Sequence, residues 1–227
     1  MLDNHQFNDA EVANILSKWF WCGIFGENYS NTNYVNDIED VLNYINGRQS
    51  MNRTVNAASF NPARLLTMKT RQSAAYKGVM ALLYKNGCMD LVSGMIMDVA
   101  KSMALVPDIH HIFPEKYCKG KGLPAEKWKS VINKTPLLPA SNRMIGGTAP
   151  SVYTAKIKKK ASIDDIELRK RAESNLIDYE TFIADDFDSY FIDRAKKILR
   201  LIEKVMGKPV TDKDFPQTIE LYGTSLA

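Results

Sequence analysis

Apolar residues recur at helical spacing on both sides of a central segment that lacks this periodicity. The pattern is clear from Ser73 to Lys85, and a longer example starts near Asp185 and stops at Gly207. Residues 105–149 lose the pattern and are rich in proline and glycine. This predicts a helical N-terminal part over 1–104 and a helical C-terminal part over 150–227. No obvious flexible linker separates the parts, so we expect one compact unit.

The central segment predicts two short strands followed by a helix. Residues 108–113 can form one strand and residues 131–138 its partner, and a short helix can begin at Pro139. Side chains alternate along a strand, so His110 and His111 would point to opposite sides. The predicted fold class is α+β, a mainly helical body with an embedded two-stranded hairpin plus helix.

Composition narrows the class of protein further. The sequence contains no apolar run long enough to span a membrane and no N-terminal signal peptide, so we expect a cytoplasmic protein without a membrane partner. Cys22, Cys88 and Cys118 are an odd number and include no C-x-x-C pair. Neither a disulfide framework nor a four-cysteine zinc site is supported, and we interpret the cysteines as free thiols.

The charge is distributed unevenly along the chain. Residues 101–160 contain 12 basic and three acidic residues, a balance of +9 in a chain of net +4, which leaves −5 elsewhere. The basic residues are Lys101, Lys116, Lys119, Lys121, Lys127, Lys129, Lys134, Arg143, Lys156, Lys158, Lys159 and Lys160. A block of this kind favours a polyanion as partner. The alternative is a solvated lysine-rich face.

Two of the chain's three histidines, His110 and His111, are adjacent and lie within this basic block, whereas His5 receives no role. Hydrolysis of a phosphodiester requires a deprotonated water, neutralised phosphate charge and a stabilised leaving alkoxide. Imidazole is neutral near pH 7 and suits the first task, since its ordinary pKa is about 6.5. A divalent cation with open coordination positions suits the other two.

The order of polar residues in this segment resembles a known nuclease family. The sequence His-His-Ile-Phe-Pro at 110–114 is followed by Asn133 and then by Asn142 and Arg143. This order resembles the HNH nucleases of the His-Me finger, or ββα-metal, class. The resemblance extends the fold prediction, because the hairpin plus helix would be a ββα-metal unit over residues 105–149.

The resemblance implies a role for each of these residues. His110 would be a metal ligand and Asn142 the second ligand, while His111 would be the general base. Asn133 would brace the loop and orient the base, a role that fixes the direction of a catalytic imidazole. The implied cofactor is a divalent metal, Mg²⁺. Because His110 stands where an aspartate is commoner, Mn²⁺ or another transition metal would also bind.

A wider resemblance covers nearly the whole chain. It is similar to the C-terminal nuclease half of GmrSD-type modification-dependent restriction endonucleases over residues 18–21, 108–114, 131–137, 141–153 and 184–188. It implies DNA, including modified DNA, as substrate and a role in restriction or anti-phage defence. Those enzymes also carry an N-terminal ParB-like nucleotide-hydrolysing domain with an Asp-Gly-Gln-Gln-Arg motif. This chain lacks that motif, so we expect a fragment, a truncated gene product or a stand-alone nuclease half, with such a domain or subunit as a partner outside this chain.

Several basic side chains are candidates for contacting nucleic acid. Arg143 and Lys134 would contact phosphate near the reaction, and Arg143 is the stronger candidate because its planar fork can bridge two oxygens. Lys156, Lys158, Lys159 and Lys160 would follow the DNA backbone. Two alternatives to an enzyme remain open at this point. One is a nucleic-acid-binding module with a degenerate HNH site, and the other is a helical assembly domain with a structural metal.

Overall fold

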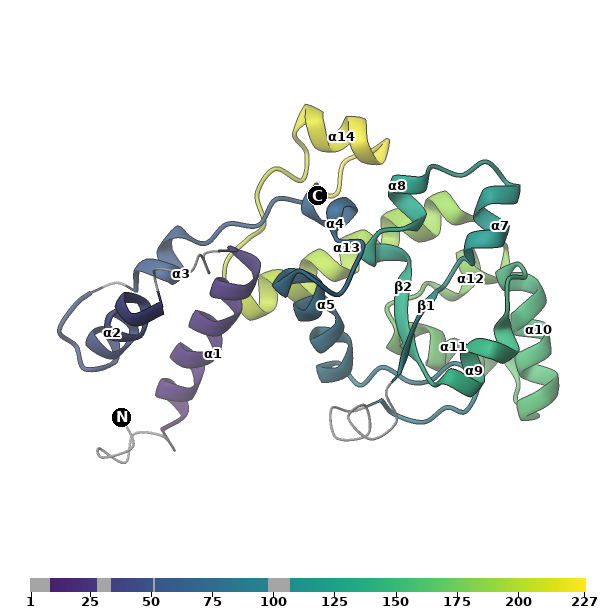
Figure 1. The fold of residues 1–227 in the computed structure, drawn as a ribbon, viewed down its shortest axis with the longest axis horizontal. Helices are drawn as coiled ribbons and strands as arrows, with labels where there is room; N and C mark the ends of the chain where they lie inside the picture. The colour runs from purple at the N-terminus through teal and green to yellow at the C-terminus, as the bar shows by residue number, and fades with distance from the viewer. Residues whose placement is uncertain (1–8, 28–33, 51, 98–106) are drawn as a thin grey trace.

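The computed structural model describes residues 9–27, 34–50, 52–97 and 107–227. It consists mainly of helices around a small antiparallel sheet, which confirms the predicted α+β class (Figure 1). The elements are α1 (Ala10–Phe25), α2 (Tyr34–Ile45), α3 (Arg53–Ala57), α4 (Arg64–Thr67), α5 (Ala74–Lys85), β1 (Asp108–His111), α7 (Glu115–Gly120), α8 (Ala125–Trp128), the 3₁₀ turn η3 (Val131–Asn133), β2 (Lys134–Leu137), α9 (Pro139–Ile145), α10 (Pro150–Ala161), α11 (Asp165–Ser174), α12 (Tyr179–Ile183), α13 (Phe187–Met206) and α14 (Pro216–Tyr222).

Local capping explains why two helices begin and end where the sequence predicts. The Ser73 hydroxyl accepts a hydrogen bond from the Tyr76 amide at the start of α5. The Asp186 carboxylate accepts one from the Ser189 amide at the start of α13, which ends at Gly207 with a φ of 62°. A left-handed residue at this position favours glycine, which has no Cβ to clash with the preceding turn.

The hairpin is present but its strands are shorter than expected. β1 and β2 are antiparallel, with Asp108 opposite Leu137 and His111 opposite Lys134. The predicted second strand began at residue 131, but residues 131–133 form η3 instead. The Asn133 side chain forms hydrogen bonds with the backbone amide and carbonyl of Phe113. These contacts hold the turn that precedes β2. α9 then begins directly after β2, at Pro139.

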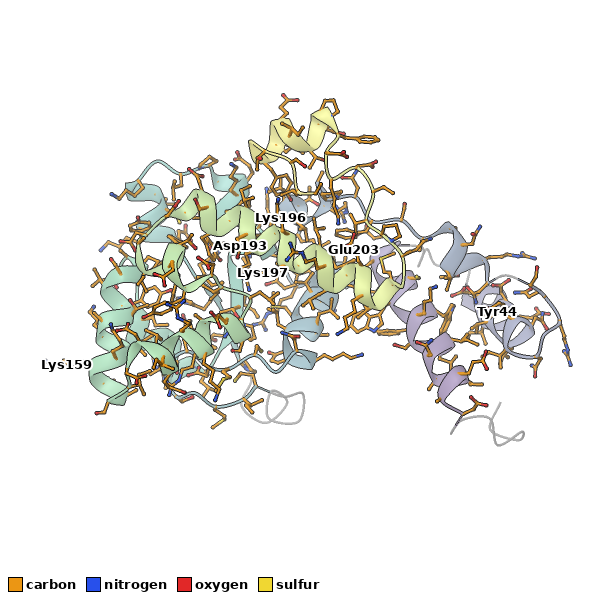
Figure 2. All side chains as sticks on the ribbon, turned by 180° about the vertical axis from the view of Figure 1, so that it is seen from behind. Tyr44, Lys159, Asp193, Lys196, Lys197 and Glu203 are labelled. Carbon is orange, nitrogen blue, oxygen red and sulfur yellow. The ribbon has the colours of Figure 1, made fainter. Side chains whose placement is uncertain are left out.

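Helix α13 packs at the centre of the hydrophobic core. Phe191, Ile198 and Ile202 lie on its buried face, whereas Lys196, Lys197 and Glu203 mark its polar face (Figure 2). α1 packs across the C-terminal end of α13, and α5 packs against both helices. The buried core continues from Trp21 to Leu226 and includes side chains from all three predicted parts.

The three cysteines, Cys22, Cys88 and Cys118, are free and buried, as the sequence predicted. In the described part of the chain, no helix is both long enough and apolar enough to cross a membrane.

Candidate functional site

A pocket of about 260 Å³ opens where β1, the start of α7 and the end of α9 meet. It is lined by Ile109, His110, His111, Pro114, Glu115, Lys116, Asn142, Gly146 and Gly147. His110 and His111 come from the strand, and Asn142 comes from the helix that follows the hairpin. The fold therefore brings Asn142 next to the two adjacent histidines, which lie more than thirty positions earlier in the sequence.

His110 and Asn142 are in direct contact. His110 is 4% exposed, and its Nδ1 lies 2.8 Å from Asn142 Oδ1. Asn142 Nδ2 donates a hydrogen bond to Asp108 Oδ2 at 3.1 Å, which turns the amide oxygen toward the imidazole. Asp108 thus orients Asn142, and its carboxylate brings a negative charge next to the pair.

The spacing of these two donor atoms fits a divalent cation. Adjacent ligands of an octahedral ion with bonds of about 2.1 Å are separated by about 3 Å. The 2.8 Å between His110 Nδ1 and Asn142 Oδ1 is close to that separation. No group of three His, Cys, Asp or Glu side chains able to hold a metal occurs within residues 9–27, 34–50, 52–97 and 107–227. The candidate ligand set therefore combines an imidazole nitrogen with an amide oxygen.

His111 has the features expected of a neutral base. The side chain is half-buried, and its ring meets Trp128 edge-on with 5.9 Å between centroids. The Nε2 atoms of both His111 and His110 are buried, and no described residue forms a hydrogen bond with them. A buried polar atom without a partner is unfavourable, and it is common where a ligand completes the site.

Burial lowers the pKa of His110 to about 4, although the hydrogen bond that His110 Nδ1 donates to Asn142 Oδ1 opposes this. Burial also lowers the pKa of His111 to about 4, and the positive charge of Lys134 adds to the effect. Desolvation disfavours a charged imidazolium, so both rings are neutral at pH 7. Each neutral ring has one nitrogen lone pair that can bind a cation or accept a proton. In His110 the hydrogen bond to Asn142 Oδ1 puts the hydrogen on Nδ1, so a cation between these two atoms would replace this hydrogen bond and require the other tautomer.

Asn133 lies where it can brace the loop that follows His111. The side chain is fully buried, and Oδ1 accepts a hydrogen bond from the Phe113 amide at 2.9 Å. Nδ2 donates to the carbonyls of Phe113 at 2.9 Å and Trp128 at 3.0 Å. One amide therefore ties the segment after β1 to the segment before β2. Its contacts hold the backbone next to His111 and do not touch the imidazole.

The two predicted phosphate contacts near the pocket differ in exposure. Arg143 is exposed on α9, one residue after Asn142. Lys134 is only 8% exposed, and its ammonium group donates a hydrogen bond to the Lys69 carbonyl and lies 5.6 Å from the centre of the Tyr76 ring. Lys134 is therefore not among the residues that line the pocket, and its contact with phosphate stays a prediction. Its strand position directs the side chain inward, toward Tyr76 of α5.

The four predicted lysines of α10 lie away from the core. Lys156, Lys159 and Lys160 are exposed, and Figure 2 shows Lys159 at the edge of the molecule. Lys158 forms an ion pair with Asp165 at 2.8 Å, so part of its charge is compensated.

Two acidic residues that position the site were not predicted for it. Asp108 could have been found from the alternation of β1, because it lies two residues before His110 and therefore on the same face. Asp90 is fully buried, and it accepts hydrogen bonds from the Leu138 amide at 2.8 Å and the Ser141 hydroxyl at 2.7 Å. It thus caps α9 from a distant segment. No local sequence signal indicates such a cap.

Comparison with known proteins gives one distant relative. The chain is 27% identical over 225 residues to the uncharacterized protein MJ0686 of Methanocaldococcus jannaschii. The match covers 96% of this chain and 36% of the relative, so the chain spans about a third of that protein's length. No protein-family model and no solved structure matches the chain.

Proposed function

We propose that the protein is a metal-dependent DNA endonuclease or nickase of the HNH type, which acts in the cytoplasm in restriction or anti-phage defence. The observation that carries the proposal is the convergence of His110, His111 and Asn142 in one pocket. Its substrate would be DNA, including modified DNA. A nucleotide-hydrolysing domain on another chain or segment would be its partner, and the greater length of the archaeal relative leaves room for additional domains.

In this proposal the chain's own residues divide the work of phosphodiester hydrolysis. His110 and Asn142 would hold Mg²⁺ or Mn²⁺, and Asp108 would keep the Asn142 oxygen in place. His111 would take the proton from the attacking water. The cation, when bound, supplies charge neutralisation for the phosphate and the leaving oxygen. Asn133 would keep His111 in position through the Phe113 backbone.

Basic side chains around the pocket would bind the DNA backbone. Arg143 is exposed one residue after Asn142, and Lys116 lines the same pocket. Lys156, Lys159 and Lys160 would add contacts that carry no sequence information. These exposed cations also support a second candidate function, a nucleic-acid-binding module with a degenerate HNH site. In that case salt-dependent DNA binding would survive the substitution His111→Ala.

The direct test is cleavage of supercoiled plasmid with Mg²⁺ or Mn²⁺, using modified and unmodified DNA. We expect nicked or linear product from the wild type, and at least a hundredfold slower cleavage by His111→Ala and Asn142→Ala. Asn46→Ala is the matched control, because Asn46 is an exposed asparagine at the end of α2. Equal cleavage by the wild type and His111→Ala would contradict the catalytic assignment. Binding without cleavage on every substrate would favour the second function.

A further inference from the structure

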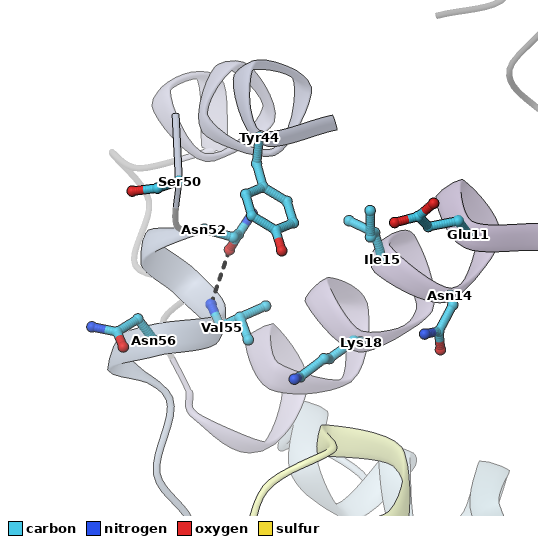
Figure 3. A pocket seen from close by; sticks show the side chains of 9 residues that line it. All are labelled: Glu11, Asn14, Ile15, Lys18, Tyr44, Ser50, Asn52, Val55 and Asn56. Atoms are coloured by element: carbon cyan, nitrogen blue, oxygen red, sulfur yellow. Dashed lines mark hydrogen bonds between the residues drawn. The ribbon is translucent and has the colours of Figure 1, made fainter. Parts of the chain in front are cut away.

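A second polar pocket of about 360 Å³ lies between α1 and the α2–α3 segment. It is lined by Glu11, Asn14, Ile15, Lys18, Tyr44, Ser50, Asn52, Val55 and Asn56 (Figure 3). Figure 1 shows α1, α2 and α3 at the end of the molecule opposite α7, α9 and α10. The pocket is therefore separate from the candidate nuclease site, and the function proposed above gives it no role.

The pocket is lined by a residue with a buried hydrogen-bond donor that no described residue satisfies. Asn52 is 4% exposed and is the N-cap of α3, where its Oδ1 accepts a hydrogen bond from the Val55 amide at 2.9 Å (Figure 3). This contact fixes the direction of the amide group. Its Nδ2 is buried and has no hydrogen-bond partner among the residues that the structure describes. A ligand with an acceptor atom would remove the penalty of this unpaired donor.

The other walls indicate which kind of ligand fits. Tyr44 lies beside Asn52 in Figure 3 and offers a ring face and a hydroxyl group. α1 contributes the carboxylate of Glu11 and the ammonium of Lys18, whose charges balance. Ile15 adds an apolar surface. The set favours a flat, overall uncharged molecule that carries hydrogen-bond acceptors on its edge.

We propose that this pocket binds a nucleobase. A base has a flat face that can stack on Tyr44, and it has ring-nitrogen or carbonyl acceptors that can pair with Asn52 Nδ2. The volume of 360 Å³ is at the lower end of the range of about 300–1,000 Å³ seen for small-molecule pockets, which suits a ligand of this size. The base is supplied either by a free nucleoside or by a nucleic-acid strand.

Asn52→Ser provides a selective test. Serine is also a good helix cap, so the substitution retains the contact to Val55 and removes the unpaired Nδ2. We expect calorimetric titration with nucleosides and with a short single-stranded DNA to detect binding to the wild type. Asn52→Ser should weaken this binding about three- to tenfold. Tyr44→Leu should weaken it at least fivefold, and Tyr44→Phe should change it little, because it keeps the ring.

The controls separate this proposal from the nuclease. His111→Ala should bind nucleosides as the wild type does, and Asn46→Ser controls for loss of an exposed asparagine outside the pocket. Binding of free nucleosides would identify them as the source of the base, whereas binding of the oligonucleotide alone would point to a strand. The proposal is overturned if neither ligand binds at millimolar concentration. It is also overturned if Asn52→Ser, with an unchanged melting temperature, binds as tightly as the wild type.

Discussion

The two pockets are stabilised in different ways. Around His110 and His111, bonds come from segments far along the chain: Asp90 holds α9, Tyr153 donates to the Ile112 carbonyl at 2.6 Å, and Asn175 contacts Thr135. These bonds hold the strands and the helix before any ligand arrives. A site supported from several directions is rigid, as a catalytic site requires.

The α1–α3 pocket depends more on contacts close in sequence. The Trp19 indole donates to Asp37 at 3.0 Å, and the Arg53 amide donates to Asp40 at 2.8 Å. One long-range anchor is Lys208, whose ammonium donates to the Val55 and Ala58 carbonyls at 2.8 and 2.7 Å. Long-range support is therefore concentrated at the His110–Asn142 pocket, whereas the α1–α3 pocket depends more on local contacts.

Removal of the Asp90 carboxylate should give the largest effect. Asp90 also accepts bonds from the Val92 amide and from the Ser93 amide and hydroxyl. Asp90→Ala leaves several buried donors unpaired, at about 1–3 kcal/mol each, so we expect a loss of about 3 kcal/mol or more in the free energy of unfolding. Urea denaturation measures this loss.

The matched control for that substitution is Asp9→Ala, which removes the exposed cap of α1. A cap of this kind contributes about 1 kcal/mol. If the two variants lose equal stability, the contrast between long-range support at the His110–Asn142 pocket and local support around α1 is wrong.

Acid should destabilise the metal-free protein through the buried imidazole of His110. The pKa of His110 is about 4 when folded, below the ordinary value of 6.5, so protons bind preferentially to the unfolded chain. The contribution of His110 to the free energy of unfolding is complete above pH 6.5. It is lost as the pH falls toward 4, by roughly 3 kcal/mol. His110→Gln should therefore show a smaller loss of stability between pH 7.5 and 4.5. Urea denaturation in EDTA measures the loss of stability in the wild type and in His110→Gln. Equal losses in the two proteins would show that His110 ionises freely in the folded state.

Asp108→Asn should have a smaller effect, confined to metal binding. The carboxylate orients Asn142 and adds negative charge, so its neutralisation should weaken Mn²⁺ binding about tenfold. The rise in melting temperature with added Mn²⁺ measures the strength of Mn²⁺ binding. The variant His110→Ala is expected to show no such rise. An unchanged response in Asp108→Asn would show that Asp108 does not support the ligand pair.

Local chemistry made much of the fold predictable. Ser73 and Gly207 act on neighbouring backbone groups, so these two helix ends could be predicted from the sequence without the tertiary structure. The hairpin and α9 could be predicted from the strand pattern and from Pro139. The loss of periodicity over 105–149 marked the segment that contains the candidate site, and the alternation of β1 was sufficient to place Asp108 beside His110.

The sequence by itself determined the type and order of the elements, because helical spacing, caps and breakers act over a few residues. Only the tertiary structure decided which polar groups are enclosed. Lys134 carries the positive charge expected of a phosphate contact, but its position in β2 buries the side chain against Tyr76. Asp90 holds the start of α9 across 48 positions, and the buried Nδ2 of Asn52 has no partner among the described residues. Burial and long-range hydrogen bonds depend on how the elements pack together, and no local pattern encodes that packing.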